Sequence, residues 1–309
     1  MTEYSVDYQG VLEEIQDEVR PFFGKGKNAD YIPALAIVPG NKFGMAIHTV
    51  EGEEFLIGDA RDDFSIQSIS KLFTLMQVLG FEGVDIWSRV GREPSGTAFN
   101  SLVQLEYEKG IPRNPFINAG AIVVTDILAS RSADTSRRIG DFYRMLSGNL
   151  SNRVDETVAL SEQEHGYRNA ALANLMRSFD NIQSPIPDLL DVYFRQCALT
   201  TSCADLAKAA LPLACGGYSP IAHKQILTVR DAKRINALLL TCGLYDAVGS
   251  FAYTVGLPAK SGVGGGIVAV LPDHFSVAVW SPELDSYGNS LVGSKALELF
   301  TTKTGLSIF

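Results

Sequence analysis

The chain has 309 residues, of which 46% are apolar and 20% are charged, the balance of an ordinary globular protein with one large or two smaller domains. Its formal net charge of -9 disfavours nucleic acid and membrane surfaces as partners, because both require a basic face. No stretch is long and apolar enough to span a bilayer, and the first residues show no secretory signal. Four cysteines without metal-type spacing are typical of reduced thiols, so we expect a cytoplasmic protein.

The first part of the chain predicts a helix, a hairpin and a second helix. Apolar spacing indicates an amphipathic helix over 11–20. Segments 45–50 and 54–57 predict two strands joined by a turn at residues 51–53. The next helix is predicted from Ser68 to Leu79 and ends at Gly80.

The middle of the chain is predicted to be mainly helical. Apolar residues recur at helical spacing in 120–130, 139–146, 162–179, 186–199, 202–214 and 228–242. Ser161 and Glu164 fit a capping box at the start of 162–179. Glu162 and Asn169 are seven residues apart, so two helical turns place them on one face.

The last part of the chain returns to strands. Segments 267–270 and 275–280 predict two strands around a turn at Pro272-Asp273, and 291–306 predicts a final helix. We therefore expect an α+β fold in which an antiparallel sheet is flanked by the terminal helices and an all-helical domain is inserted. Residues 1–67 and 243–309 would form the sheet domain, and 68–242 the helical domain. The active site would lie in the cleft between them.

Ser68-Ile69-Ser70-Lys71 is an SxxK motif. Residues three apart on a helix share a face, so a neutral Lys71 amine can accept the proton of the Ser68 hydroxyl. A serine at a helix N-terminus also has backbone N–H groups close to a developing oxyanion. With 25 serines and 11 lysines in the chain, about one SxxK is expected by chance, so the motif alone does not distinguish a nucleophile from an ordinary helix start.

Acyl-serine enzymes with SxxK also carry Lys-Ser/Thr-Gly on a strand that faces the serine. Lys303-Thr304-Gly305 matches this string, but it lies four residues from the C-terminus and fits a helix end. Lys260-Ser261-Gly262 precedes two predicted strands and a helix, so we assign the second motif to it. Motifs and topology together resemble the serine β-lactamase and penicillin-binding-protein fold. The Ser-Asp-Asn element of that group has no match here, which counts against penicillin-type chemistry.

Strings from about Tyr31 to the last helix closely resemble the glutaminase family. They are Ala29–Pro33, Gln67–Lys71, Glu93–Gly96, Asn114–Ala121, Ser161-Glu162, Arg168-Asn169, Cys242–Asp246 and Gly256–Val263. The resemblance implies hydrolysis of L-glutamine to L-glutamate and ammonia through an acyl-serine, without a cofactor. It also suggests a homodimer or homotetramer.

Carried over position by position, the resemblance implies that Ser68 is the nucleophile and Lys71 the general base. Tyr245 would transfer a proton near the leaving ammonia, and Lys260 would lie beside the Ser-Lys pair. Backbone N–H groups of Ser68 and Val263 would form the oxyanion hole. The amino acid would be held by Tyr31, Gln67, Asn118, Glu162, Asn169 and Tyr193. Glu162 suits the ammonium, and the Asn and Tyr groups suit the carboxylate.

Simpler interpretations remain open for these residues. Tyr193 and Tyr245 are of a type found more often in cores than as ligands. Glu162 fits a solvated first-turn carboxylate, and Asn118 fits the first turn of an ordinary helix begun by Asn114-Pro115.

The alternatives for the whole chain are a penicillin-type acyl-serine hydrolase or esterase, and a non-catalytic amino-acid-binding module. The glycines at 262–266 precede a strand rather than a helix, which argues against nucleotide binding. The scattered histidines (His48, His165, His223 and His274) predict no metal site.

Overall fold

A computed structural model describes residues 6–81, 83–95 and 102–309. Residues 1–5, where no signal was predicted, and Gly96 of the Glu93–Gly96 string lie outside the described residues.

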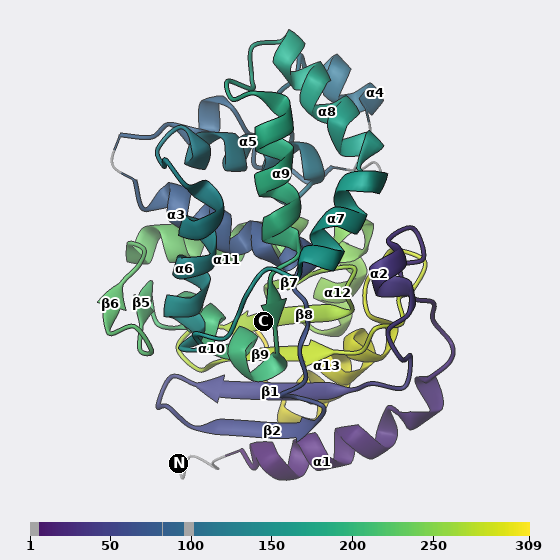
Figure 1. Cartoon of the computed structure of the whole chain (residues 1–309). Coiled ribbons are helices and arrows are strands. Elements are labelled where there is room, and N and C mark those ends of the chain that lie inside the picture. The colour runs from purple at the N-terminus through teal and green to yellow at the C-terminus, as the bar shows by residue number, and fades with distance from the viewer. Residues whose placement is uncertain (1–5, 82, 96–101) are drawn as a thin grey trace.

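An antiparallel five-stranded sheet lies across the lower half of the molecule in Figure 1. Its strand order is β2-β1-β9-β8-β7, with β1 (Gly44–Thr49), β2 (Glu54–Gly58), β7 (Ala259–Ser261), β8 (Gly266–Leu271) and β9 (Phe275–Trp280). The β1 and β9 strands pair along their whole length, from Gly44 opposite Trp280 to Thr49 opposite Phe275. The N-terminal hairpin and the C-terminal strands therefore form one sheet, and the four predicted strands are confirmed to within one residue at each end.

The two terminal helices, α1 (Tyr8–Glu18) and α13 (Leu291–Thr304), cover one face of this sheet (Figure 1). Leu12 and Ile15 of α1 and Phe300 of α13 are fully buried in the core that they form with the strands. The alternating apolar residues of the strands supply the other side of this core. The predicted α+β class, with an antiparallel sheet flanked by terminal helices, is confirmed.

Lys303-Thr304-Gly305 forms the C-terminus of α13, as predicted for the rejected motif. Gly305 has a φ of 69° and caps the helix in the left-handed conformation. Lys303 forms ion pairs of 2.7 Å with Glu14 and Glu18 of α1. This lysine therefore links the two terminal helices.

The opposite face of the sheet packs against α10 (Cys203–Ala214) and, beyond it, the helical block in the upper half of Figure 1. One apolar cluster joins Ala46, Val268 and Ala278 of the strands to the helices without a break. The sheet and the helical block thus share a core. The division into domains at 67/68 and 242/243 stays a prediction.

The remaining elements are mostly helical. They are α2 (Pro33–Ala36), α3 (Ser70–Leu79), α4 (Leu102–Tyr107), α5 (Asn118–Ala129), α6 (Thr135–Ser147), α7 (Glu156–His165), α8 (Tyr167–Ser178), α9 (Ile186–Cys197), α11 (Val229–Cys242) and α12 (Val248–Thr254), with short strand pairs β3 (Phe64–Ser65) with β4 (Thr200–Thr201) and β5 (Tyr218–Ser219) with β6 (Lys224–Gln225). Across the described part of the chain, no single helix is long and apolar enough to cross a membrane. The pair Val229–Cys242 and Tyr245–Thr254, bent by 94°, meets that criterion by length and composition only.

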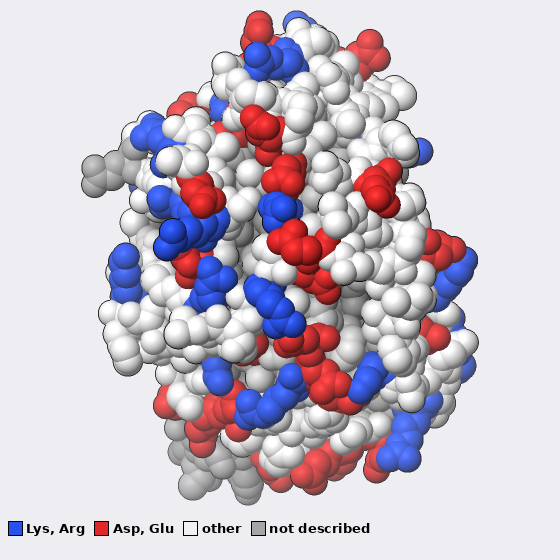
Figure 2. Space-filling model, in the orientation of Figure 1, with Lys and Arg blue, Asp and Glu red and all other residues white. Residues whose placement is uncertain are grey.

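Charged side chains of both signs lie interspersed over the face shown in Figure 2. Ion pairs among the described residues include Lys42 with Asp62 at 2.7 Å and Arg195 with Glu156 at 2.8 Å. Side chains of opposite charge are therefore mixed over this face rather than separated into one acidic and one basic patch.

The segment predicted as one helix over 162–179 is two helices that meet at Gly166. A Cβ at Gly166 would collide with the ring of Phe194, which packs there from α9. The prediction that Glu162 and Asn169 lie on one helical face is therefore wrong, because Glu162 belongs to α7 and Asn169 to α8.

The predicted capping box at Ser161 and Glu164 is also wrong. Helix α7 begins earlier, and Asp155 caps it by accepting hydrogen bonds from the backbone N–H groups of Thr157 and Val158. Ser161 is a buried residue inside the helix. Asp155 lies six residues before Ser161, and aspartate, like serine, is a preferred N-cap residue.

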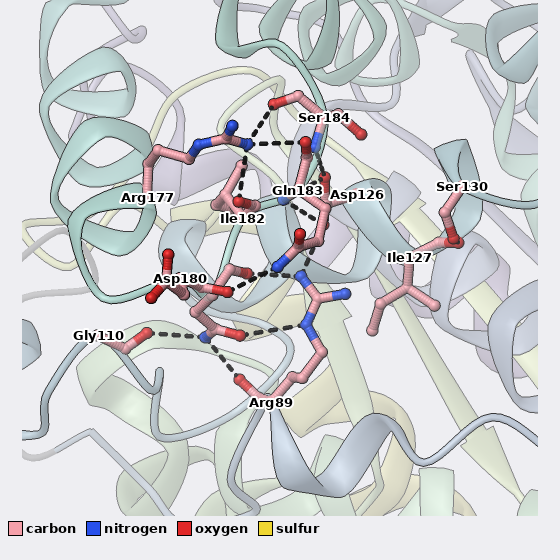
Figure 3. A network of polar contacts seen from close by, with 11 residues as sticks. Arg89, Gly110, Asp126, Ile127, Ser130, Arg177, Asp180, Ile182, Gln183 and Ser184 are labelled. Atoms are coloured by element: carbon pink, nitrogen blue, oxygen red, sulfur yellow. Dashed lines mark hydrogen bonds and ion pairs between the residues drawn. The ribbon is translucent and has the colours of Figure 1, made fainter.

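A buried carboxylate ties α5 to two surface loops (Figure 3). Asp126, which is 0% exposed, accepts hydrogen bonds from Arg89 Nη2 at 2.6 Å and from the backbone N–H of Ser184 at 2.8 Å. Arg89 also donates to the carbonyl oxygen of Asn181 at 2.5 Å. Burial acts to raise the pKa of Asp126, but these hydrogen bonds hold it below its usual value. The network fixes the helix that begins at Asn118.

Replacing Asp126 with asparagine is expected to lower the free energy of unfolding by about 3–5 kcal/mol, because Arg89 loses its buried partner. Asp141→Asn is the matched control, since its ion pair with Arg144 is exposed and is expected to contribute at most about 1 kcal/mol. Urea unfolding of the two variants and the parent measures both losses. Equal losses in the two variants would show that the network in Figure 3 does not stabilise the fold.

Candidate active site

Ser68 lies in a short 3-10 turn, Gln67–Ile69, that leads directly into α3. The serine thus lies two residues before the α-helix, rather than at its first residue as predicted. Gln67 has a φ of 50°, in the left-handed region that non-glycine residues rarely occupy. Its buried side chain donates to Ser65 Oγ at 2.9 Å. This unusual backbone, typical of functional sites, leaves Ser68 half-buried at a cavity.

Lys71 is 1% exposed, and its amine is bonded to the segment that precedes and begins α5. Nζ donates to the carbonyl oxygen of Phe116 at 3.1 Å and to Asn118 Oδ1 at 2.6 Å. Burial lowers the pKa of Lys71 to about 8, although Cys197 and Glu162 act in the opposite direction. An amine with this pKa has a substantial neutral fraction near pH 8, which is what a general base requires.

The Asn114–Ala121 string builds the acceptors for that amine. Asn114 Oδ1 accepts from the backbone N–H groups of Phe116 and Ile117, which fixes the turn before α5. A Cβ at Gly120 would collide with the carbonyl oxygen of Asn114, so glycine is required there. The interpretation of Asn118 as the start of a helix is correct, and the same turn also directs two oxygens at Lys71.

Lys260 lies behind the cavity on β7. Its Nζ donates to the carbonyl oxygens of Gly243 at 2.9 Å and Ser261 at 2.6 Å, and it lies 5.0 Å from the centre of the Tyr245 ring. Burial and the nearby Lys71 hold the pKa of Lys260 well below its usual value. The selected motif therefore lies next to Tyr245, a residue of the cavity wall, whereas Lys303 lies on the far face of the sheet.

Gly262 allows the turn after β7 to approach the serine. A Cβ at this position would lie 2.7 Å from the carbonyl oxygen of Ile66 and 3.2 Å from the backbone nitrogen of Ser68. Only glycine accommodates an approach this close. Val263, the next residue, lines the same cavity as Ser68.

Tyr245 begins a 3-10 turn after α11 and, like Gln67, has a φ of 50°. Burial raises the pKa of Tyr245 to about 12, while a hydrogen bond with the Ser68 side chain opposes the rise. The phenol hydroxyl therefore lies beside the serine. The interpretation of Tyr245 as a core residue is incomplete, because its ring is largely enclosed but also lines the cavity.

A cavity of about 440 Å³ opens in front of Ser68, within the usual size range of small-molecule sites. It is lined by the residues predicted to hold a substrate: Tyr31, Gln67, Ser68, Asn118, Glu162, Asn169, Tyr193, Tyr245 and Val263. Tyr31 is 55% exposed, whereas Tyr193 is buried. The structure thus brings together residues that lie far apart in the sequence.

Six further residues line the cavity and had no predicted role in the site: Ile32, His165, Gly166, Tyr167, Arg168 and Cys197. Four of them surround the break between α7 and α8, which a glycine within a predicted helix can signal. Cys197 lies four residues after Tyr193 on α9, so helical spacing could have placed it on the same face.

The walls of the cavity carry polar groups of complementary kinds. Asn118 Nδ2 donates to Asn169 Oδ1 at 2.9 Å. Burial raises the pKa of Glu162 to about 7, against the effects of a hydrogen bond with Gln67 and of Lys71. Glu162 is therefore not a solvated helix-end carboxylate. An ionised carboxylate, amides and phenols in one cavity can bind an amino acid with both of its charges.

Among the described residues, no group of three or more His, Cys, Asp or Glu side chains is arranged to hold a metal ion.

Comparison with known proteins gives a consistent result. The glutaminase family model matches residues 26–309. A glutaminase from Ralstonia nicotianae is 56% identical over 304 residues, which cover 98% of this chain and 100% of the relative. A solved Bacillus subtilis probable glutaminase is 35% identical, covers 97% of each chain and superposes with a TM-score of 0.89. A covalent complex of a B. subtilis glutaminase with 5-oxo-L-norleucine, formed by reaction with 6-diazo-5-oxo-L-norleucine, is 34% identical, covers 97% of this chain and 99% of that chain, and has a TM-score of 0.86. This chain belongs to the glutaminase family.

Proposed function

We propose that the chain hydrolyses the side-chain amide of L-glutamine to L-glutamate and ammonia through an acyl-serine on Ser68. The main support is one cavity in which Ser68 faces groups suited to a free amino acid, and whose wall residue Asn118 accepts a hydrogen bond from the buried Lys71 amine. The covalent complex formed by the B. subtilis relative is consistent with a nucleophile in such a cavity.

In the acylation step, the neutral Lys71 amine accepts the Ser68 proton while the serine oxygen attacks the amide carbon. Backbone N–H groups of Ser68 and Val263 stabilise the oxyanion. Support for this pairing comes from Gly262, which lets the turn carrying Val263 approach the Ser68 backbone. Tyr245, whose hydroxyl lies beside Ser68, donates a proton to the leaving nitrogen as the carbon–nitrogen bond breaks. Water then hydrolyses the ester, with the proton transfers reversed.

The substrate is held by charge and by hydrogen bonds. Ionised Glu162 pairs with the α-ammonium, and Asn118 and Asn169 lie together on the cavity wall, where their amides can donate to the carboxylate. Tyr31 and Tyr193 enclose the aliphatic chain. The family resemblance also supports assembly as a homodimer or homotetramer, which light scattering would measure.

Ser68→Ala is expected to reduce ammonia release from L-glutamine by at least about 10³-fold while the protein remains folded, because no other group supplies the nucleophile. Ser70→Ala is the matched control. It removes the buried hydroxyl at the first residue of α3, which lies 4.0 Å from Cys197 Sγ and does not line the cavity. Normal turnover by the Ser68 variant, with circular dichroism showing the native fold, would disprove the acyl-serine route.

The pH dependence of kcat/KM is expected to reflect Lys71. Because the pKa of Lys71 is about 8, the amine is protonated at lower pH, so kcat/KM should fall as the pH decreases through this value. Lys71→Arg keeps a cation that does not lose its proton near neutral pH, and it should be inactive at every pH. A pH-independent rate from pH 6 to 9, or an active arginine variant, would contradict this role.

Glu162→Gln is expected to raise the KM for L-glutamine by about tenfold or more, with a smaller change in kcat, because the ammonium loses its charged partner. In the parent, KM should rise as the pH falls through about 7, where Glu162 becomes protonated. This pH dependence of KM should be absent in the variant, while the fall in kcat/KM near pH 8 should remain. Glu164→Gln, an exposed change on the same helix, serves as the control. An unchanged KM in Glu162→Gln would assign ammonium binding to another group.

A further inference from the structure

A second cavity, of about 280 Å³, lies on the other side of Tyr245. Its walls include apolar surface from Phe116, Ile117 and Val248, and Thr241 from the end of α11. The carboxylate of Asp246 is exposed and lies on its lining. The proposed reaction does not use this space.

The wall between the two cavities is thin. Tyr245 lines both of them. The segment from Phe116 to Asn118 passes from one to the other, since Ile117 lines the second cavity and Asn118 the first. The carbonyl oxygen of Phe116 also accepts the hydrogen bond from Lys71. The second cavity therefore adjoins the reacting groups.

The position of Tyr245 sets the direction in which a leaving group departs. If the proposed function holds, the amino acid part of the substrate occupies the first cavity toward Glu162, and the amide nitrogen faces the Tyr245 hydroxyl. A substituent on that nitrogen then extends past the tyrosine toward Phe116, Ile117 and Val248. At about 30 Å³ per water molecule, the space is large enough for a short carbon chain.

We propose that the second cavity is a leaving-group site for short N-alkyl substituents, so that the enzyme hydrolyses γ-N-methyl and γ-N-ethyl amides of L-glutamate as well as L-glutamine. The bond from Ser68 oxygen to the amide carbon forms, and the carbon–nitrogen bond breaks. The departing alkylamine takes up a proton from Tyr245, and water then releases glutamate from the serine. Asp246 attracts the alkylammonium product as it reaches solvent.

The experiment compares kcat/KM for L-glutamine and for the γ-N-methyl and γ-N-ethyl amides, with glutamate release as the common measurement. The parent is expected to hydrolyse the ethyl amide with a kcat/KM within about tenfold of that for glutamine. Thr241→Trp fills the second cavity from an exposed helix position and should lower the ethyl-to-glutamine ratio by about tenfold or more. The kcat/KM of this variant for L-glutamine should stay within about twofold of the parent value, because the leaving ammonia is small.

Ala237→Trp is the matched control. Ala237 lies one turn earlier on α11, is also exposed, and lines a neighbouring hollow with Trp87 and Arg92 instead of the second cavity. This variant should leave the ratio unchanged. Hydrolysis of glutamine but not of the alkyl amides by the parent would overturn the proposal, as would an equal ratio in the two tryptophan variants. If the parent releases no glutamate from glutamine, the proposed function itself fails and this site fails with it.

Discussion

The burial of the Lys71 amine is the constraint on which the rest of the site depends. A charged ammonium removed from water costs several kcal/mol, so the group must lose its proton or find acceptors. Here it finds two, the carbonyl oxygen of Phe116 and Oδ1 of Asn118, and its pKa is nonetheless lowered to about 8. Both acceptors come from a turn that Asn114 and Gly120 make possible. An SxxK motif with an exposed lysine would place an ordinary cation beside the serine, because burial is what lowers the pKa.

Asn118 connects the buried base to the substrate cavity. Its side-chain oxygen accepts from Lys71, so its amide nitrogen must face the other way, where it donates to Asn169. A chain of hydrogen bonds therefore runs from α3 through α5 to α8. The Asp126 network holds the later part of α5 against the loops at Arg89 and Ser184. A shift of α5 would thus move the acceptor of the base and the cavity wall together.

Local patterns in the sequence were enough to predict the sheet and most helices. The alternating apolar residues of the strands are a short-range pattern, and the strands that they form were predicted correctly. The position of Lys260 ahead of β8 and β9 was also predicted correctly. The helix break at Gly166 was missed because the glycine was taken as part of one continuous helical pattern, and the contact that requires glycine there, with the ring of Phe194 from α9, is non-local. The left-handed backbone at Gln67 and Tyr245 was also not predicted, since side chains of this type give no local signal for it. The gathering of site residues in one cavity was suggested only by the family strings.

The break at Gly166 has a consequence for recognition that a continuous helix would not allow. Seven residues along a straight α-helix rise by about 10 Å, so Glu162 and Asn169 would be separated by roughly two turns. The ammonium and carboxylate of an amino acid are attached to the same carbon, so groups that bind both must converge. The turn between α7 and α8 lets both residues line one cavity, with Asn169 bonded to Asn118. Gly166, at which α7 ends, therefore helps to make the binding of a free amino acid possible. The ring of Phe194 leaves no room for a larger side chain at this position.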